Sequence, residues 1–132
     1  MSRRLIAFMN AYTEGISGGD ACFVEIAKRL VKYDKIVITS ILGKRLCESR
    51  GLKARYLITT KEHHFENVIY TYSRRLLKAL FLRVDVSEGD ILYATSDFIP
   101  DVIPALIKKI CKRKTTWVQK IFHLIPSDRI VP

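Results

Sequence analysis

A glycine-rich segment near the N-terminus has the composition of a loop that binds phosphate. Gly15, Gly18 and Gly19 let the backbone approach a ligand closely. Asp20 follows them and can cap a helix, whose first N–H groups and positive dipole end attract an anion. The spacing matches neither the dinucleotide GxGxxG motif nor the P-loop with its Lys-Ser/Thr. A tight turn between a strand and a helix accounts for the same residues equally well.

Three further polar residues follow apolar runs later in the chain. Ser96 and Asp97 come after residues 91–95, and His123 comes after residues 115–122. A histidine exchanges protons near neutral pH and can donate or accept a hydrogen bond, although a structural histidine bonded to the backbone is an equal alternative. Asp97 can bind a hydroxyl group or cap a turn.

Neither the histidines nor the cysteines have the spacing of a metal site. His63 and His64, with two glutamates nearby, superficially suggest a metal cluster. Adjacent histidines in a loop cannot easily point at one ion, so a solvated loop is the better interpretation. The three cysteines stand singly, which indicates buried thiols in a reducing compartment. We therefore expect a cytoplasmic protein with no metal and no cofactor.

The elements that must position these residues alternate along the whole chain. Strand-like apolar runs occupy residues 5–10, 35–40, 54–59, 91–95 and 115–122. Helical patterns begin at Asp20, occupy residues 44–50 and 68–82, and resume at Asp101. Alternation of this kind predicts one α/β domain over residues 1–132, a Rossmann-like three-layer sandwich with a mainly parallel sheet of at least five strands. Ligands of such sheets bind beyond the carboxyl ends of the strands, where the polar residues described above fall.

Helical spacing predicts which side chains face the core. The expected buried stripes are Phe23, Ile26, Ala27, Leu30 and Val31 in the first helix, Ile69, Tyr72, Leu76 and Leu80 in the third, and Ile103, Leu106, Ile107, Ile110 and Cys111 in the last. Pro104 is expected in the first turn of the last helix, where its missing N–H costs little.

The chain is strongly basic, with a net charge of +10 from 23 basic and 13 acidic residues. Much of the excess lies between residues 44 and 83, so we expect attraction to phosphates, anionic lipids or nucleic acid. Arg74, Arg75, Lys78 and Arg83 alternate with leucines in the third helix, as in helices that lie on anionic membranes. A core helix with a solvated basic face is the alternative. The abundance of Ile, Lys and Arg beside a single Gln resembles the composition of a thermophile.

Three segments together resemble the N-terminal, acceptor-side domain of retaining GT-B glycosyltransferases of the family 4 type. The first is Gly18-Gly19-Asp20 with the helical residues 21–30 that follow. The second, residues 89–96, is similar to the strand before that family's acceptor pocket. The third, residues 117–126, is similar to its strand ending in a loop with a histidine and a proline. Most of the specificity lies in the first and third segments.

This resemblance implies a role for each candidate residue. Gly18, Gly19 and Asp20 would face the donor diphosphate, Ser96 and Asp97 would bind the acceptor, and His123 would act near the reacting sugar. His123 would hydrogen-bond a sugar hydroxyl or stabilise charge at the anomeric centre. The family's second domain binds most of the nucleotide sugar and carries its acidic pair. We therefore expect residues 1–132 alone to be an inactive half of the enzyme.

The implied substrates are a nucleotide sugar and a glycan or lipid-linked acceptor, and an anionic membrane surface is an implied partner. The alternative is a stand-alone Rossmann-like module that binds a nucleotide or nucleic acid. Helix-turn-helix, RRM and KH signatures are absent from the sequence, so we do not expect nucleic acid as a partner.

Overall fold

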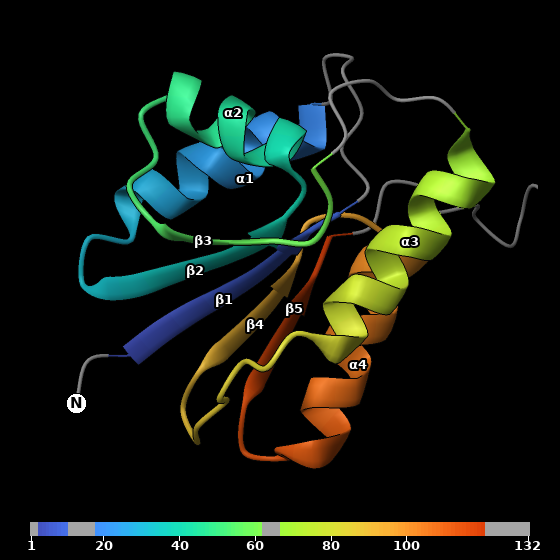
Figure 1. The fold of residues 1–132 in the computed structure, drawn as a ribbon. Coiled ribbons are helices and arrows are strands. Elements are labelled where there is room, and N and C mark those ends of the chain that lie inside the picture. The colour runs from blue at the N-terminus through green and yellow to red at the C-terminus, as the bar shows by residue number, and fades with distance from the viewer. Residues whose placement is uncertain (1–2, 11–17, 62–66, 121–132) are drawn as a thin grey trace, which may run out of the picture.

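The structure, a computed structural model, describes residues 3–10, 18–61 and 67–120 of the chain. Within these ranges, five parallel strands form one sheet in the order β3-β2-β1-β4-β5 (Figure 1). They are β1 (Arg3–Met9), β2 (Tyr33–Thr39), β3 (Arg55–Ile58), β4 (Ile91–Ala94) and β5 (Thr116–Gln119). The α/β class with a parallel sheet of at least five strands is therefore confirmed.

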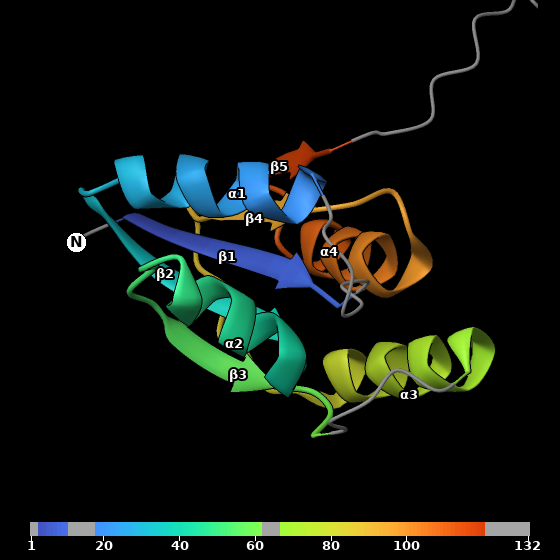
Figure 2. The ribbon, with the colours of Figure 1, turned by 90° about the horizontal axis from the view of Figure 1, so that it is seen from above.

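Four helices in the described ranges alternate with these strands. They are α1 (Gly18–Arg29), α2 (Ile41–Ser49), α3 (Val68–Phe81) and α4 (Ile99–Cys111). Figure 1 shows α1 and α2 along one face of the sheet and α3 beside α4 along the other. Figure 2 shows α3 at the outside of the molecule, next to α4.

The central strand β1 is buried on both faces, which gives the domain two cores. Leu5, Ala7 and Met9 pack beneath α1 and α2, in a cluster with Phe23 of α1. The alternating residues, such as Phe8, pack beneath α3 and α4. Successive side chains of a strand point to opposite faces, so the unbroken apolar run of β1 is what a three-layer sandwich requires.

The starts of helices α2 and α4 differ from the sequence prediction. Helix α2 begins three residues earlier than expected, because Ser40 caps it by accepting from Gly43 N at 3.3 Å. Helix α4 begins at Ile99 rather than at Asp101, with Pro100 in its first turn. The expectation that Pro104 lies in the first turn is therefore wrong, and Pro104 lies inside the helix.

The predicted helix faces are partly wrong. In α1 Ile26 is exposed, and Val31, predicted for the same stripe, is exposed and lies beyond the end of the helix. In α4 the predicted residues Ile107, Ile110 and Cys111 are exposed, whereas Pro100, Asp101, Pro104 and Ala105 are buried. The buried side of α4 therefore consists of two prolines, an alanine and a hydrogen-bonded carboxylate in place of the predicted stripe.

All three cysteines lie in the described ranges and are free thiols. Cys47 is buried as expected, whereas Cys22 is half-buried and Cys111 is exposed. In the part of the chain that the structure describes, the helices are too short or too polar to cross a membrane.

Candidate functional site

Because the strands are parallel, their carboxyl ends meet at one edge of the sheet, which we call the carboxyl edge. Strand β1 lies between β2, which follows it in the chain, and β4, which belongs to the second half of the domain. Open α/β sheets bind ligands at such a switch point. Asn10 follows β1 and Ser96 lies just beyond β4, so both lie beside it.

Asn10 is fully buried and hydrogen-bonds in four directions. Its side chain accepts from Thr59 Oγ1 at 3.0 Å and donates through Nδ2 to Pro100 O at 3.2 Å. Its backbone N–H donates to Asp101 Oδ1 at 2.5 Å, and its carbonyl accepts from Arg75 Nη1 at 2.7 Å. Asn10 therefore joins the end of β1 to α3, to α4 and to the residue after β3.

The bond between Asn10 and Pro100 O has a cause in the sequence of α4. An α-helix would use the N–H of residue 104 to pair the carbonyl of residue 100. Pro104 has no N–H, so this carbonyl receives no bond from residue 104. The amide of Asn10 donates to it instead. The proline inside α4 thus provides the acceptor that anchors the end of β1.

Ser96 and Asp101 form a second part of the same network. Ser96 Oγ donates to Asp101 Oδ2 at 2.5 Å and accepts from Phe98 N at 3.2 Å. Gln119 Nε2 of β5 donates to Ser96 O at 2.5 Å. Ser96 is buried, so its hydroxyl holds the turn between β4 and α4 together. Asp97 lies half-buried in the same turn, beside Ser96.

The glycines of the first candidate segment lie at the start of α1. Gly18 and Gly19 are the first two described residues of this helix, and Asp20 is buried in its first turn. The prediction that Asp20 caps the helix is wrong, because the helix already includes Gly18. Its carboxylate still lies where the helix dipole favours a negative charge.

The charges of Arg75, Asp101 and Asp20 all act on the hydroxyl of Tyr72 in α3. Burial raises the pKa of its hydroxyl, the positive charge of Arg75 lowers it, and the carboxylates of Asp101 and Asp20 raise it. The net effect is a raised pKa, so Tyr72 stays protonated at neutral pH and can donate a hydrogen bond. Tyr72 also lines an apolar groove of about 350 Å³ between α3 and the start of α4.

Two buried polar atoms at the carboxyl edge have no hydrogen-bond partner among the described residues. Thr60 Oγ1 lies two residues beyond β3, and Gln119 Oε1 is at the last residue of β5. Buried polar atoms without a partner are rare in folded proteins and often mark a place for a ligand or water. They indicate that a ligand or water could form hydrogen bonds at both outer strands of the sheet, after β3 and at the end of β5.

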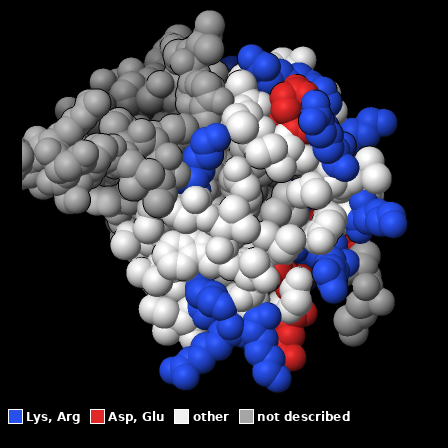
Figure 3. Space-filling model, turned by 180° about the vertical axis from the view of Figure 1, so that it is seen from behind, with Lys and Arg blue, Asp and Glu red and all other residues white. Residues whose placement is uncertain are grey.

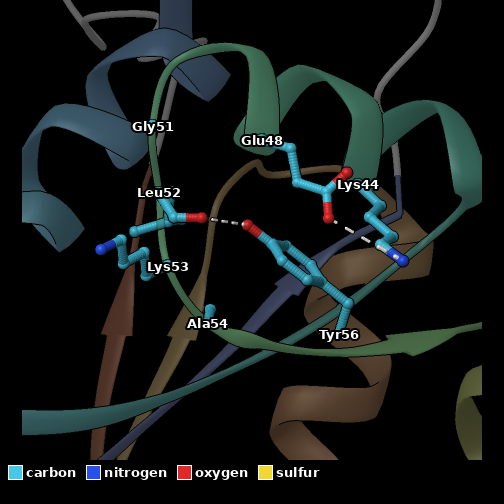
Figure 4. A pocket seen from close by; sticks show the side chains of 7 residues that line it. All are labelled: Lys44, Glu48, Gly51, Leu52, Lys53, Ala54 and Tyr56. Atoms are coloured by element: carbon cyan, nitrogen blue, oxygen red, sulfur yellow. Dashed lines mark hydrogen bonds and ion pairs between the residues drawn. The ribbon is translucent and has the colours of Figure 1, made fainter.

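A second pocket, of about 600 Å³, lies near the start of β3 (Figure 4). Its polar groups bond one another: Tyr56 donates to Leu52 O at 2.7 Å, and Lys44 pairs with Glu48 at 3.9 Å. Lys44 also lies 6.0 Å from the centroid of the Tyr56 ring. The pocket is at the opposite end of the strands from the switch point, so we do not assign the site there.

His123, Gly15 and the pair His63 and His64 lie outside the described residues, so their roles stay predictions. Within the described ranges, the structure contains no group of three His, Cys, Asp or Glu residues that could hold a metal ion. Sequence reasoning did not identify Asn10 as a site residue, although a polar residue directly after a buried strand was a usable signal.

Two other members of the network were assigned differently from the sequence. The sequence pattern groups Arg75 with the basic side chains of α3 and predicts Asp101 at the start of a helix. Each makes its contact with a residue more than sixty positions away in the chain, which no local pattern reveals.

Comparisons with family models, with curated proteins and with solved structures give no match.

Proposed function

We propose that residues 1–132 form the acceptor-side domain of a GT-B glycosyltransferase, which transfers a sugar from a nucleotide-sugar donor to a glycan or lipid-linked acceptor. The observation that carries this proposal is the start of α1. Gly18 and Gly19 begin a helix that follows β1, the strand beside the switch point. The first N–H groups of a helix have no partner within it and favour a phosphate.

In this proposal the backbone of the first turn of α1 binds the donor diphosphate. A carboxylate close to a diphosphate repels it, so Asp20 contributes its N–H group rather than its side chain. Asp20 is buried, which keeps its carboxylate away from the surface where a ligand would lie. His123 is proposed as the catalytic residue, near the anomeric centre.

The acceptor is proposed to bind between β4 and α3. Asp97 and the hydroxyl of Tyr72 are the polar groups assigned to it, whereas Ser96 positions Asp97 through the turn that it stabilises. The apolar groove beside Tyr72 suits an acceptor with a hydrocarbon part. We propose a cytoplasmic protein that works at the periphery of a membrane, where such acceptors are found.

An NMR titration with uridine and guanosine diphosphates tests the phosphate site. We expect weak binding, with amide shift changes concentrated at Gly18, Gly19 and Asp20. Gly18→Pro removes one N–H at a position where helices tolerate proline, and it should abolish these changes. Gly18→Ala keeps the N–H and is the matched control. Shift changes confined to other parts of the domain, or equal effects of the two variants, would refute the assignment.

The net charge of +10 is the observation behind a second candidate function, a stand-alone module for nucleic acid. Figure 3 shows one face of the molecule, on which Lys and Arg gather in separate groups around an uncharged middle. Nucleic-acid sites usually present a continuous basic stripe, so this face is a poor match. A gel shift with mixed RNA and DNA decides the matter. Binding that weakens steeply with salt would support the second function.

A further inference from the structure

Helix α3 buries an arginine and exposes several of its large apolar side chains. The side chains beneath it, four residues apart, are Thr71, Arg75 and Ala79, and Arg75 is fully buried. Away from these buried residues, Ile69 is 80% exposed beside the apolar groove and Phe81 is 81% exposed on the outer side of the helix. The prediction that Ile69 faces the core is therefore wrong. Arg75 takes the inner position because its guanidinium donates to Asn10 O, and this rotates the apolar residues outward.

The exposed side has an ordered arrangement, which we call the α3 face. Tyr70, Leu77 and Phe81 are seven and four residues apart, so they form one apolar line along the helix. Arg74 and Lys78 follow this line on one flank, and the Arg74 guanidinium lies 5.5 Å from the centroid of the Tyr70 ring. The residues from 68 to 83 include no Asp or Glu, so the charge of the α3 face is entirely positive.

The apolar groove lies along the other flank of the α3 face. Leu76 of α3 and Phe98 and Ile99 at the start of α4 line it, and Ile99 is 63% exposed. The apolar surface therefore continues from α3 to α4, beside the carboxyl edge. Contiguous exposed apolar surface is uncommon on soluble proteins and marks contact with a partner or a membrane.

We propose that the α3 face binds the surface of an anionic lipid bilayer. Helices that lie in a membrane interface combine a line of apolar side chains with basic residues. Leu77 and Phe81 would enter the boundary of the acyl chains, while Arg74 and Lys78 would meet the lipid phosphates. This inference rests on the proposed function for its peripheral location, and it adds the binding surface and the charge of the lipid. The bond from Arg75 to Asn10 would hold the carboxyl edge at a set position above the bilayer.

Flotation of residues 1–132 with lipid vesicles tests the proposal. We expect binding to vesicles of phosphatidylcholine with phosphatidylglycerol and little binding to phosphatidylcholine alone. The double variants Leu77→Ser, Phe81→Ser and Arg74→Gln, Lys78→Gln should each lower the partition coefficient by about 10-fold or more. These residues are outside the core, so melting curves should show that the variants stay folded.

Matched controls come from α1 and the residues after it, on the other face of the sheet. Val31 is 80% exposed, and Arg29 and Lys32 are exposed basic residues, so Val31→Ser and the double variant Arg29→Gln, Lys32→Gln change similar chemistry elsewhere. They should leave the partition coefficient within about 2-fold of the parent chain. An equal loss in the controls would mean diffuse charge attraction and would overturn the proposal. So would equal binding to both vesicle types or no vesicle binding.

Two further outcomes separate this inference from other interpretations. If the chain dimerises and the Leu77→Ser, Phe81→Ser variant is monomeric, the α3 face binds protein and the lipid proposal is wrong. Gly18→Pro should leave vesicle binding unchanged, because Gly18 is on a different helix. Vesicle binding without nucleotide-induced changes in the amide NMR shifts would refute only the glycosyltransferase proposal. Nucleotide-induced shift changes without vesicle binding would refute only the lipid inference.

Discussion

Replacing Asn10 by alanine should destabilise the domain more than an ordinary polar substitution. The change removes the acceptor of Thr59 Oγ1 and the donor to Pro100 O, both in a fully buried position. Two lost hydrogen bonds cost about 1 kcal/mol each, and a buried carbonyl left without its donor adds about 1–2 kcal/mol. We expect the free energy of unfolding to fall by about 3–4 kcal/mol, and the melting temperature by roughly 12 °C.

A double-mutant cycle with Pro104 tests the physical reason for this loss. Pro104→Ala supplies an N–H that can pair Pro100 O within the helix, so Asn10 is no longer needed as its donor. Asn10→Ala should therefore cost about 1–2 kcal/mol less in the Pro104→Ala background than in the parent chain. The packing lost with the proline ring cancels in the cycle. Urea unfolding of the four proteins measures these differences.

The cycle has a clear negative outcome and a control. If the two substitutions add within about 0.5 kcal/mol, Asn10 does not compensate for the missing N–H of Pro104, and the account of the network is wrong. Asn67, the other asparagine of the chain, is exposed and caps α3 by accepting from Tyr70 N at 3.2 Å. Asn67→Ala should cost about 1 kcal/mol and show no coupling to Pro104.

Other substitutions test the packing between α2 and the sheet and the reactivity of the thiols. A Cβ added at Gly43 would overlap Thr39 Oγ1 and lie 2.9 Å from Met9 Cε. Gly43→Ala should therefore lower the free energy of unfolding by about 1–3 kcal/mol, despite the better helix propensity of alanine. An unchanged midpoint of urea unfolding would contradict this prediction. Burial raises the pKa of Cys47 to about 12, so iodoacetamide at pH 8 should alkylate exposed Cys111 and spare Cys47, as mass spectrometry can show. The unfolded chain releases the Cys47 proton above pH 9 or so while the folded protein keeps it, so stability should fall as the pH rises past this value, and less so in Cys47→Ala.

The sequence by itself was enough to predict the architecture. Apolar runs such as residues 5–10 and amphipathic stretches alternate strictly, and right-handed crossovers leave few other folds for that pattern. It also predicted that the polar residues following the strands share one edge of the sheet, because the carboxyl ends of parallel strands meet there. Segment ends were less accurate: α2 begins at Ile41 because of the Ser40 cap, and α4 begins at Ile99.

Only the tertiary structure decided which side chains build that edge and which face water. Asn10 and Asp101 meet across ninety-one positions of the chain, and Arg75 reaches Asn10 from a third element. Helical periodicity assumes that apolar side chains point inward, as it did for Ile69. A buried guanidinium that needs a carbonyl partner overrides this preference, because an unpaired charge in the core costs more than an exposed isoleucine. That balance depends on neighbours that are distant in the sequence, and so local patterns could not predict it.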